Sequence, residues 1–196
     1  MPRKGSATSA LLVGLVLGAL IGAAATYLAL QALRQQAAAG AELELLPNRA
    51  YFERVSRLIA GARRSVYVVM FVMKYDPNES PERDPANRLI TLLVDAAARG
   101  VDVRVVVDDT TKQSYPETIA FLKSKGVPVK LDPKAGVTTH AKLVIVDGSC
   151  AVIGSHNWTQ SALASNNELS VLTCSREVVE GATRYFMELW EGGRPA

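Results

Sequence analysis

The stretch His140–Asn157, HAKLVIVDGSCAVIGSHN, decides how the rest of this 196-residue chain is interpreted. It predicts a strand, a tight turn, a second strand and a loop. Side chains alternate between the two faces of a strand, so His140 and Lys142 share one face while Asp147 lies on the other. A histidine beside a lysine at the mouth of an apolar strand is costly to bury. We therefore expect these two residues to serve a site, and Asp147 to anchor the turn.

Strand and helix patterns alternate through residues 47–196. They predict an α/β sandwich with a mixed, largely parallel sheet. The expected strands cover 65–73, 101–107, 127–131, 140–147 and 168–174. One helix is expected to begin near Asn48, and three further helices are expected over 88–99, 115–125 and 177–190. Asp108 and Asp109 follow one strand and offer oxygen ligands for magnesium. Adjacent side chains on a strand diverge, however, so a turn or helix cap is the favoured interpretation.

Residues 1–34 are predicted to be a membrane anchor. The run from Gly5 to Leu33 contains no charged residue, and its length exceeds the roughly 20 apolar residues that cross a bilayer. The segment expected to lie in the membrane is 10–33. The flanking basic residues weakly favour a cytoplasmic N-terminus and a domain outside. The alternative is a signal peptide cleaved near Ala37–Ala39, which the length of the run and the intervening Arg34 disfavour. Residues 35–46 are expected to be a linker.

Small residues recur every four positions within the predicted anchor. Positions 10, 14, 18, 22 and 26 are Ala, Gly, Gly, Gly and Thr. This spacing places all five on one face of a helix, where small side chains let two membrane helices approach closely. The stripe slightly favours a helix that pairs, over the alternative that glycine is simply frequent in membrane helices.

Charge and cysteine content limit the function classes. Three of the 22 basic residues and none of the 19 acidic ones lie in residues 1–34, so the remainder carries 19 of each and is formally neutral. It lacks the broad basic surface of a dedicated nucleic-acid binder. Cys150 and Cys174 lie in apolar strand-like runs and are expected to be buried thiols rather than a disulfide.

The polar residues around the central stretch suit metal-free attack on a phosphodiester. No cluster has the spacing of zinc ligands, and no glycine-rich phosphate loop is present. A neutral His140 imidazole can act as nucleophile, and Glu168 is the best carboxylate to hold its other ring nitrogen. Lys142, the Ser155 hydroxyl and the Asn157 amide could stabilise the charge that develops on phosphoryl oxygens.

The spacing of these residues resembles the HKD motif of the phospholipase D superfamily. All six fixed positions match over eighteen residues: His140, Lys142, Asp147, Gly154, Ser155 and Asn157. The resemblance covers roughly residues 45–192. Larger members of this superfamily carry two motifs, whereas this chain carries one. It is therefore similar to the small single-motif members, which include bacterial endonucleases and mitochondrial-type phospholipases D.

The resemblance implies a two-step phosphodiesterase that needs neither metal nor cofactor. His140 would form a phosphohistidine, Lys142 and Asn157 would bind phosphate with support from Ser155, and Glu168 would orient His140. Asp147 and Gly154 would be structural. A homodimer would bring two copies of His140 to one phosphate, and the substrate would be a phospholipid or a nucleic acid. The alternative is a membrane-tethered domain that binds phosphate groups without turnover.

Overall fold

The computed structural model describes residues 18, 20, 22–31 and 43–196, and the chain divides into two units, residues 1–41 and 42–196. The described residues of the first unit are helical, and all but Gln31 are exposed. Most of the predicted anchor, including Gly14, lies outside the described residues. Within the described part of the chain, no helix combines the length and apolar character needed to cross a membrane.

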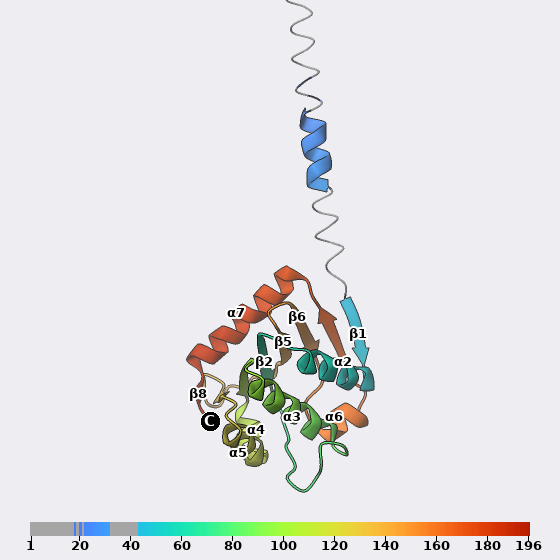
Figure 1. Cartoon of the computed structure of the whole chain (residues 1–196). Helices are drawn as coiled ribbons and strands as arrows, with labels where there is room; N and C mark the ends of the chain where they lie inside the picture. Colours follow the sequence, from blue (N-terminus) through green and yellow to red (C-terminus); the bar gives the residue numbers. More distant parts are fainter. Residues whose placement is uncertain (1–17, 19, 21, 32–42) are drawn as a thin grey trace, which may run out of the picture. The chain divides into compact units, whose positions relative to one another are not determined.

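The second unit is built on one eight-stranded sheet with the strand order β1-β7-β6-β5-β2-β3-β4-β8 (Figure 1). The strands are β1 Leu43–Pro47, β2 Ser65–Met70, β3 Asp102–Val107, β4 Val129–Leu131, β5 Lys142–Val146, β6 Cys150–Gly154, β7 Leu169–Thr173 and β8 Arg194–Pro195. The helices are α2 Arg49–Ala60, α3 Pro85–Ala98, α4 Asp109–Ser114, α5 Pro116–Ser124, α6 Gln160–Ala164 and α7 Arg176–Gly192. The predicted α/β class and mixed sheet are confirmed.

The sheet is not largely parallel, which corrects the prediction. Only the β2–β3 and β3–β4 pairs are parallel, because α3 and α5 connect those strands as crossovers. The other five strand pairs, from β1 to β2 and between β4 and β8, are antiparallel. The hairpin of β5 and β6 reverses the chain, and β7 reverses it again, so this half of the sheet is antiparallel throughout.

Two apolar cores lie on opposite faces of the sheet. One packs α2, α3 and α5 against residues such as Val68 and Val105. The other packs α7, through Phe186, against residues such as Val69 and Ile145. The central strands are therefore buried on both faces, which explains their nearly continuous runs of β-branched residues. The amphipathic pattern of α2 is confirmed, since Tyr51 and the apolar residues that follow it at helical spacing face the first core.

The turn between β5 and β6 is held by Asp147. Its carboxylate accepts hydrogen bonds from the backbone N–H groups of Arg63, Arg64 and Ser65, at 2.7 to 3.1 Å. Both Asp147 and Gly148 have positive φ, at 56° and 59°, as a tight hairpin turn requires. Asp147 thus ties the hairpin to the start of β2, at the opposite end of β5 from His140.

Several short elements were missed by the sequence patterns. Residues 43–46, assigned to the linker, belong to β1, which pairs with β7 far away in sequence. The helix expected over 88–99 begins earlier, at Pro85, because the Asp84 carboxylate caps its first turn. The helices α4 and α6 have six and five residues, too few for a helical period to stand out.

The cysteine prediction was wrong. Cys150 and Cys174 form a disulfide between the start of β6 and the residue after β7. The register pairs Ala151 with Thr173, so the next residue outward on each strand is a cysteine. Cys174 is exposed and Cys150 is half-buried. The sequence carries no information on this register, which is set by the antiparallel pairing of β6 with β7.

Candidate active site

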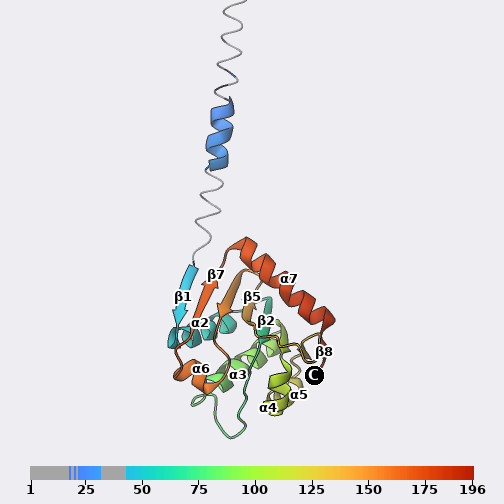
Figure 2. The ribbon, with the colours of Figure 1, turned by 180° about the vertical axis from the view of Figure 1, so that it is seen from behind.

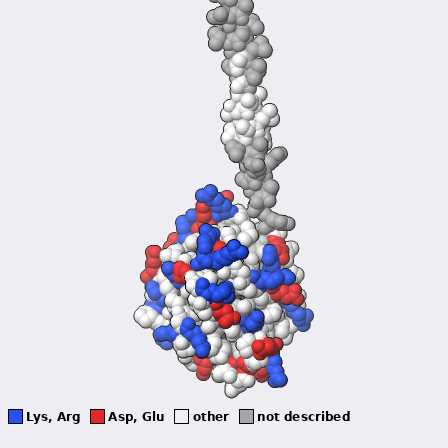
Figure 3. All heavy atoms as spheres, in the orientation of Figure 1, with Lys and Arg blue, Asp and Glu red and all other residues white. Residues whose placement is uncertain are grey.

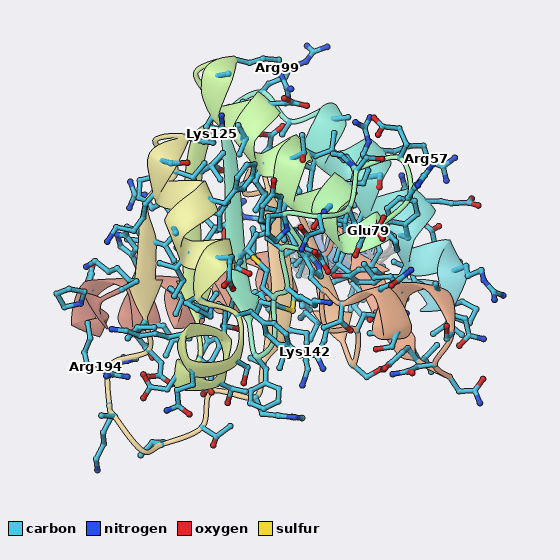
Figure 4. All side chains as sticks on the ribbon, turned by 90° about the horizontal axis from the view of Figure 1, so that it is seen from below. Arg57, Glu79, Arg99, Lys125, Lys142 and Arg194 are labelled. Carbon is cyan, nitrogen blue, oxygen red and sulfur yellow. A yellow bond between two sulfur atoms is a disulfide. The ribbon has the colours of Figure 1, made fainter. Side chains whose placement is uncertain are left out.

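The predicted site residues gather at one edge of the sheet. Residue His140 immediately precedes β5, Ser155 and Asn157 follow β6, and Glu168 precedes β7. Because β5, β6 and β7 are mutually antiparallel, the start of β5, the end of β6 and the start of β7 meet at the same edge. In Figure 4, which looks onto this edge, Lys142 lies between α4 and α6.

His140 is exposed and Lys142 is buried beneath it. The Lys142 ammonium donates to the His140 carbonyl oxygen at 2.8 Å and lies 3.0 and 3.1 Å from the two ring nitrogens. One ammonium cannot align with the lone pairs of both nitrogens, which point in different directions, so this contact is with the face of the ring. Phe71 contacts the imidazole at 4.4 Å between centroids. Packing and the lysine therefore position the ring, and neither ring nitrogen is engaged in a well-aligned hydrogen bond by these contacts.

The environment of Lys142 suits a cation that binds an anionic ligand. Burial lowers the pKa of its ammonium, while the negative charge of Glu168 acts in the opposite direction. The ammonium also lies 5.0 Å from the centroid of the Phe71 ring. A bound phosphate would supply the negative charge that this partly desolvated cation lacks.

Ser155, Asn157 and Glu168 are each held by hydrogen bonds. The Asn157 side-chain oxygen accepts from the Val72 N–H at 3.3 Å, which turns the NH₂ group of that amide into the donor available to a ligand. The Ser155 hydroxyl donates to one Glu168 carboxylate oxygen and accepts the Leu169 N–H at 3.0 Å. These contacts fix the loop that follows β6 against the start of β7.

Within one chain, Glu168 contacts other partners than His140, the residue it was predicted to orient. Its carboxylate accepts from Ser155 and from the Asn166 side chain, and the two described residues Glu168 and His140 share no hydrogen bond. Burial acts to raise the pKa of Glu168, but these hydrogen bonds and the positive charge of Lys142 outweigh it and hold the pKa below its ordinary value. Glu168 is thus an ionised carboxylate that braces Ser155.

Gly154 permits the close approach of β6 and β7 beneath the site. A Cβ atom at this position would lie 2.1 Å from the Ser170 hydroxyl and 2.4 Å from its Cα. Backbone as well as side chain stands in the way, so even alanine does not fit without moving one strand. This close approach explains physically why the motif has a glycine before Ser155.

The second histidine, His156, lies under the site and is fully buried. Its Nε2 donates to the Asn48 carbonyl at 2.9 Å, so its Nδ1 accepts from the Ser170 hydroxyl at 2.7 Å. The ring stacks on Tyr51 with 4.2 Å between centroids. Burial lowers the pKa of His156, and both ring nitrogens are occupied.

Two residues that support the site were not identified from the sequence. Asn48, with φ of 49°, exchanges hydrogen bonds with Glu168 through its backbone N–H and side-chain oxygen, at 2.9 and 2.8 Å. Asp108 caps α4, as one of the two interpretations expected, and its other carboxylate oxygen accepts the Thr139 N–H at 2.8 Å. It therefore fixes the backbone just before His140. Only a positive φ, which a sequence does not display, marks Asn48.

Asp108 and Asp109 do not form a joint cation site. Asp109 pairs with Arg194 at 2.8 Å, and the same guanidinium bridges to Asp132. In the part of the chain that the structure describes, no group of three His, Cys, Asp or Glu side chains is arranged to hold a metal ion.

The sequence of this chain matches a known protein family. The family model described as "Cardiolipin synthase, PLD-like domain" matches residues 55–190. The chain therefore belongs to the phospholipase D-like family.

Two curated relatives are mitochondrial cardiolipin hydrolases. The Danio rerio protein is 32% identical over 145 residues, which cover 74% of this chain and 59% of that one. The Homo sapiens protein is 30% identical over 167 residues, which cover 81% of this chain and 62% of that one. The chain thus spans about three fifths of the length of these relatives.

A solved structure shares the fold. It is the phospholipase D family member Nuc from Salmonella typhimurium, which is 23% identical and matches with a TM-score of 0.65 over 79% of this chain and 99% of that chain. At this identity the likeness concerns the fold, and the chemistry must be argued from the residues of this chain.

Proposed function

We propose that the protein is a phosphodiesterase of the phospholipase D type that works through a phosphohistidine intermediate. The observation that carries this proposal is the arrangement of an exposed imidazole, His140, on a buried ammonium, Lys142, beside the Asn157 amide at one sheet edge. An imidazole can itself act as the nucleophile, so the proposed chemistry draws on side chains of this chain.

In the proposed first step, one His140 ring nitrogen attacks phosphorus and the bond to the leaving oxygen breaks. A second histidine donates a proton to that oxygen. Water then attacks phosphorus, gives a proton back to the second histidine, and releases the phosphoryl product with a free His140. Lys142 and Asn157 bind the non-bridging oxygens, where negative charge increases in the transition state, and Ser155 is kept in place by Glu168.

The general acid must come from a second copy of the chain. The sequence has two histidines, and His156 is fully buried with both ring nitrogens engaged. One chain therefore offers a single histidine to the site. A homodimer that faces two copies of His140 supplies the missing acid, and pairing of the anchors through Gly14, Gly18 and Gly22 would raise the local concentration of the two domains.

We also propose that the domain is tethered to a membrane by residues 10–33 and lies on its outer side. The uncharged N-terminal run supports the tether. The disulfide between Cys150 and Cys174 supports an oxidising compartment, because cytosolic thiols are kept reduced. Protease digestion of sealed, right-side-out cells tests this: the domain should be cleaved without lysis, and protection would reverse the orientation.

The chemical proposal is tested with the full chain in detergent. The protein should hydrolyse bis(4-nitrophenyl) phosphate with a chelator present, and His140→Ala should lower the rate at least about a thousandfold. Activity that survives His140→Ala would refute the nucleophile, and activity lost to the chelator would indicate metal chemistry. The matched control is Ser149→Ala, which changes an exposed residue in the turn at the far end of the same hairpin.

The shared site is tested by mixing wild type with His140→Ala. After subunit exchange at equal amounts, about one quarter of the dimers carry two intact chains, and activity should fall to about that fraction of an equal total of wild type. A value of one half, the dilution expected of independent subunits, would contradict the proposal. A bell-shaped dependence of rate on pH is expected as well, because one His140 must be neutral and the other protonated.

A further inference from the structure

A groove of about 410 Å³ opens between α7 and the ends of β5 and β6 that lead to the candidate site. Lys142 and Gly154, two residues of the motif, line it. Its other lining residues are Ala141, Leu143, Ile153, Val178, Gly181, Ala182 and Tyr185. The groove lies on the α7 face of the sheet, beside the strand ends that carry these two residues of the motif.

The lining of the groove is apolar and partly open to solvent. Lys142 is its single charged residue, and the ammonium of that side chain is bound to His140. Ile153, Val178 and Tyr185 are 43%, 42% and 42% exposed. Large apolar side chains gathered at this exposure around a concave surface are typical of a site that an apolar ligand covers.

Small residues of α7 keep the groove open. Gly181 and Ala182 face it, and a Cβ atom added at Gly181 would meet only the Arg184 guanidinium, at 3.8 Å. Nothing in the packing of α7 therefore requires a glycine here. A larger residue would occupy the groove without displacing the described core, which provides a direct way to block it.

The apolar surface continues beyond the groove along the same face of the sheet. The register places Leu45 beside Val171 and Val171 beside Ile153, so their side chains point to the side on which α7 packs. Leu43, Leu45 and Leu169 are 65%, 65% and 53% exposed. The helix α7 packs on β2, β5 and β6 and runs diagonally away from β1 (Figure 2).

The chemistry of this surface favours a lipid over a nucleic acid. Single strands are held by cationic grooves with stacked aromatic rings, and this groove offers one engaged lysine and one tyrosine. On the opposite, α2 and α3 side of the domain, which Figure 3 shows, positive and negative side chains are interspersed and form no broad cationic surface. The apolar N-terminal run ends at Leu33, so at most about 35 Å of extended chain separates it from Leu43. A tether in a bilayer would keep the groove close to phospholipids.

We propose that this groove binds an acyl chain of a phospholipid while its phosphodiester lies at His140. This inference rests on the phosphodiesterase function proposed above. It assigns Ile153, Val178, Gly181 and Tyr185 to substrate selection, although none of them touches the reacting atoms.

The test compares monomeric diacyl phosphatidylglycerols that have chains of four, six and eight carbons. For the full-length wild type, kcat/KM should rise with chain length, by up to about fourfold for each methylene that becomes buried. Ile153→Glu places a charge in the groove and Gly181→Leu fills it. Both should flatten this dependence and leave kcat/KM for bis(4-nitrophenyl) phosphate within about twofold of wild type.

Leu43→Glu is the matched control, because it places the same charge on an exposed residue of the same sheet face outside the groove. It should keep the chain-length dependence. A wild type with no such dependence, or groove variants that retain it, would overturn the acyl site. If the groove variants hydrolyse neither substrate and also have the mass of a monomer instead of a dimer, a second copy of the chain occupies the groove instead. A wild type inactive on every diester would refute the proposed function itself.

Discussion

The two histidines of this chain differ in exposure and in hydrogen bonding, although they lie at the same end of one short hairpin. His140 is exposed, contacts Phe71 and Lys142 through its ring, and keeps its nitrogens accessible. His156 is fully buried, stacks on Tyr51, and has both nitrogens engaged. A nucleophile needs a free lone pair, whereas a buried imidazole needs every polar atom paired. The structure thus separates an exposed layer, which carries the proposed nucleophile, from a buried structural layer.

Replacing each histidine by alanine in turn is the strongest test of this difference, because one substitution should lower stability and the other should not. His156→Ala removes the stack on Tyr51 and leaves the Asn48 carbonyl and the Ser170 hydroxyl without their partner. We expect a loss of about 3–4 kcal/mol in the free energy of unfolding. His140→Ala should change that free energy by less than about 0.5 kcal/mol, because its side chain is exposed. Urea denaturation of both variants checks this, and equal losses would erase the distinction.

Gly154 joins the two layers, and its substitution should affect both. The Cβ of Gly154→Ala would overlap the backbone of Ser170, whose hydroxyl holds His156. We expect a loss of about 3 kcal/mol in stability and a lower kcat, because Ser155 would move with the strand. The same assays measure it, with Gly148→Ala as a comparison in which positive φ, and not a close neighbour, is the difficulty. A Gly154→Ala protein of wild-type stability would show that β6 and β7 can separate without cost.

The motif and strand parity predicted which residues of the exposed layer lie together. They predicted few contacts of the buried layer. The motif spacing grouped His140, Lys142, Ser155 and Asn157, and the structure brings them to one edge of the sheet. The partner of Glu168 could not be predicted, since it depends on how β7 pairs with β6.

The fold was predictable where patterns are local. The long helices and the buried strands carry strong periodicities, and they lie where these patterns placed them. The antiparallel half of the sheet, the strand β1 and the disulfide all depend on which strand lies beside which. That choice is made by packing between residues distant in sequence, such as Leu45 beside Val171, and no short window of sequence records it.

Asp147 tests how much the far end of the hairpin contributes to the free energy of unfolding, in comparison with the layer under the site. Burial acts to raise the pKa of Asp147, but backbone N–H groups of Arg63, Arg64 and Ser65 outweigh it and hold the pKa below its ordinary value. Since the pKa is lowered on folding, the ionised carboxylate stabilises the protein above pH 3.8 and this contribution is lost as the pH falls below it. Asp147→Asn should cost about 2 kcal/mol at pH 7 and less in acid. Denaturation at both pH values checks this, and a cost independent of pH would refute it.

Glu168 offers the smallest and most specific test, because it lies at the boundary between the two layers. Its pKa is lowered in the folded protein, against the effect of burial, by hydrogen bonds from Ser155 and Asn166. The ionised form therefore stabilises the fold above pH 4.5, and protonation removes that contribution as the pH falls below its folded value. Glu168→Gln keeps an acceptor for Ser155, so its stability at pH 7 should fall by at most about 1 kcal/mol, and its stability should depend less on pH than that of the wild type between neutral and acidic solution.

Activity then distinguishes a brace from a partner of His140. If Glu168 acts only through Ser155, Glu168→Gln should raise KM for bis(4-nitrophenyl) phosphate more than it lowers kcat, because phosphate binding is what Ser155 supports. If the carboxylate reaches His140 of a second copy in the dimer, kcat should fall and the bell-shaped pH profile should shift, because an ionised neighbour raises the pKa of an imidazole. An unshifted profile with a raised KM would assign Glu168 to the structural layer, together with His156.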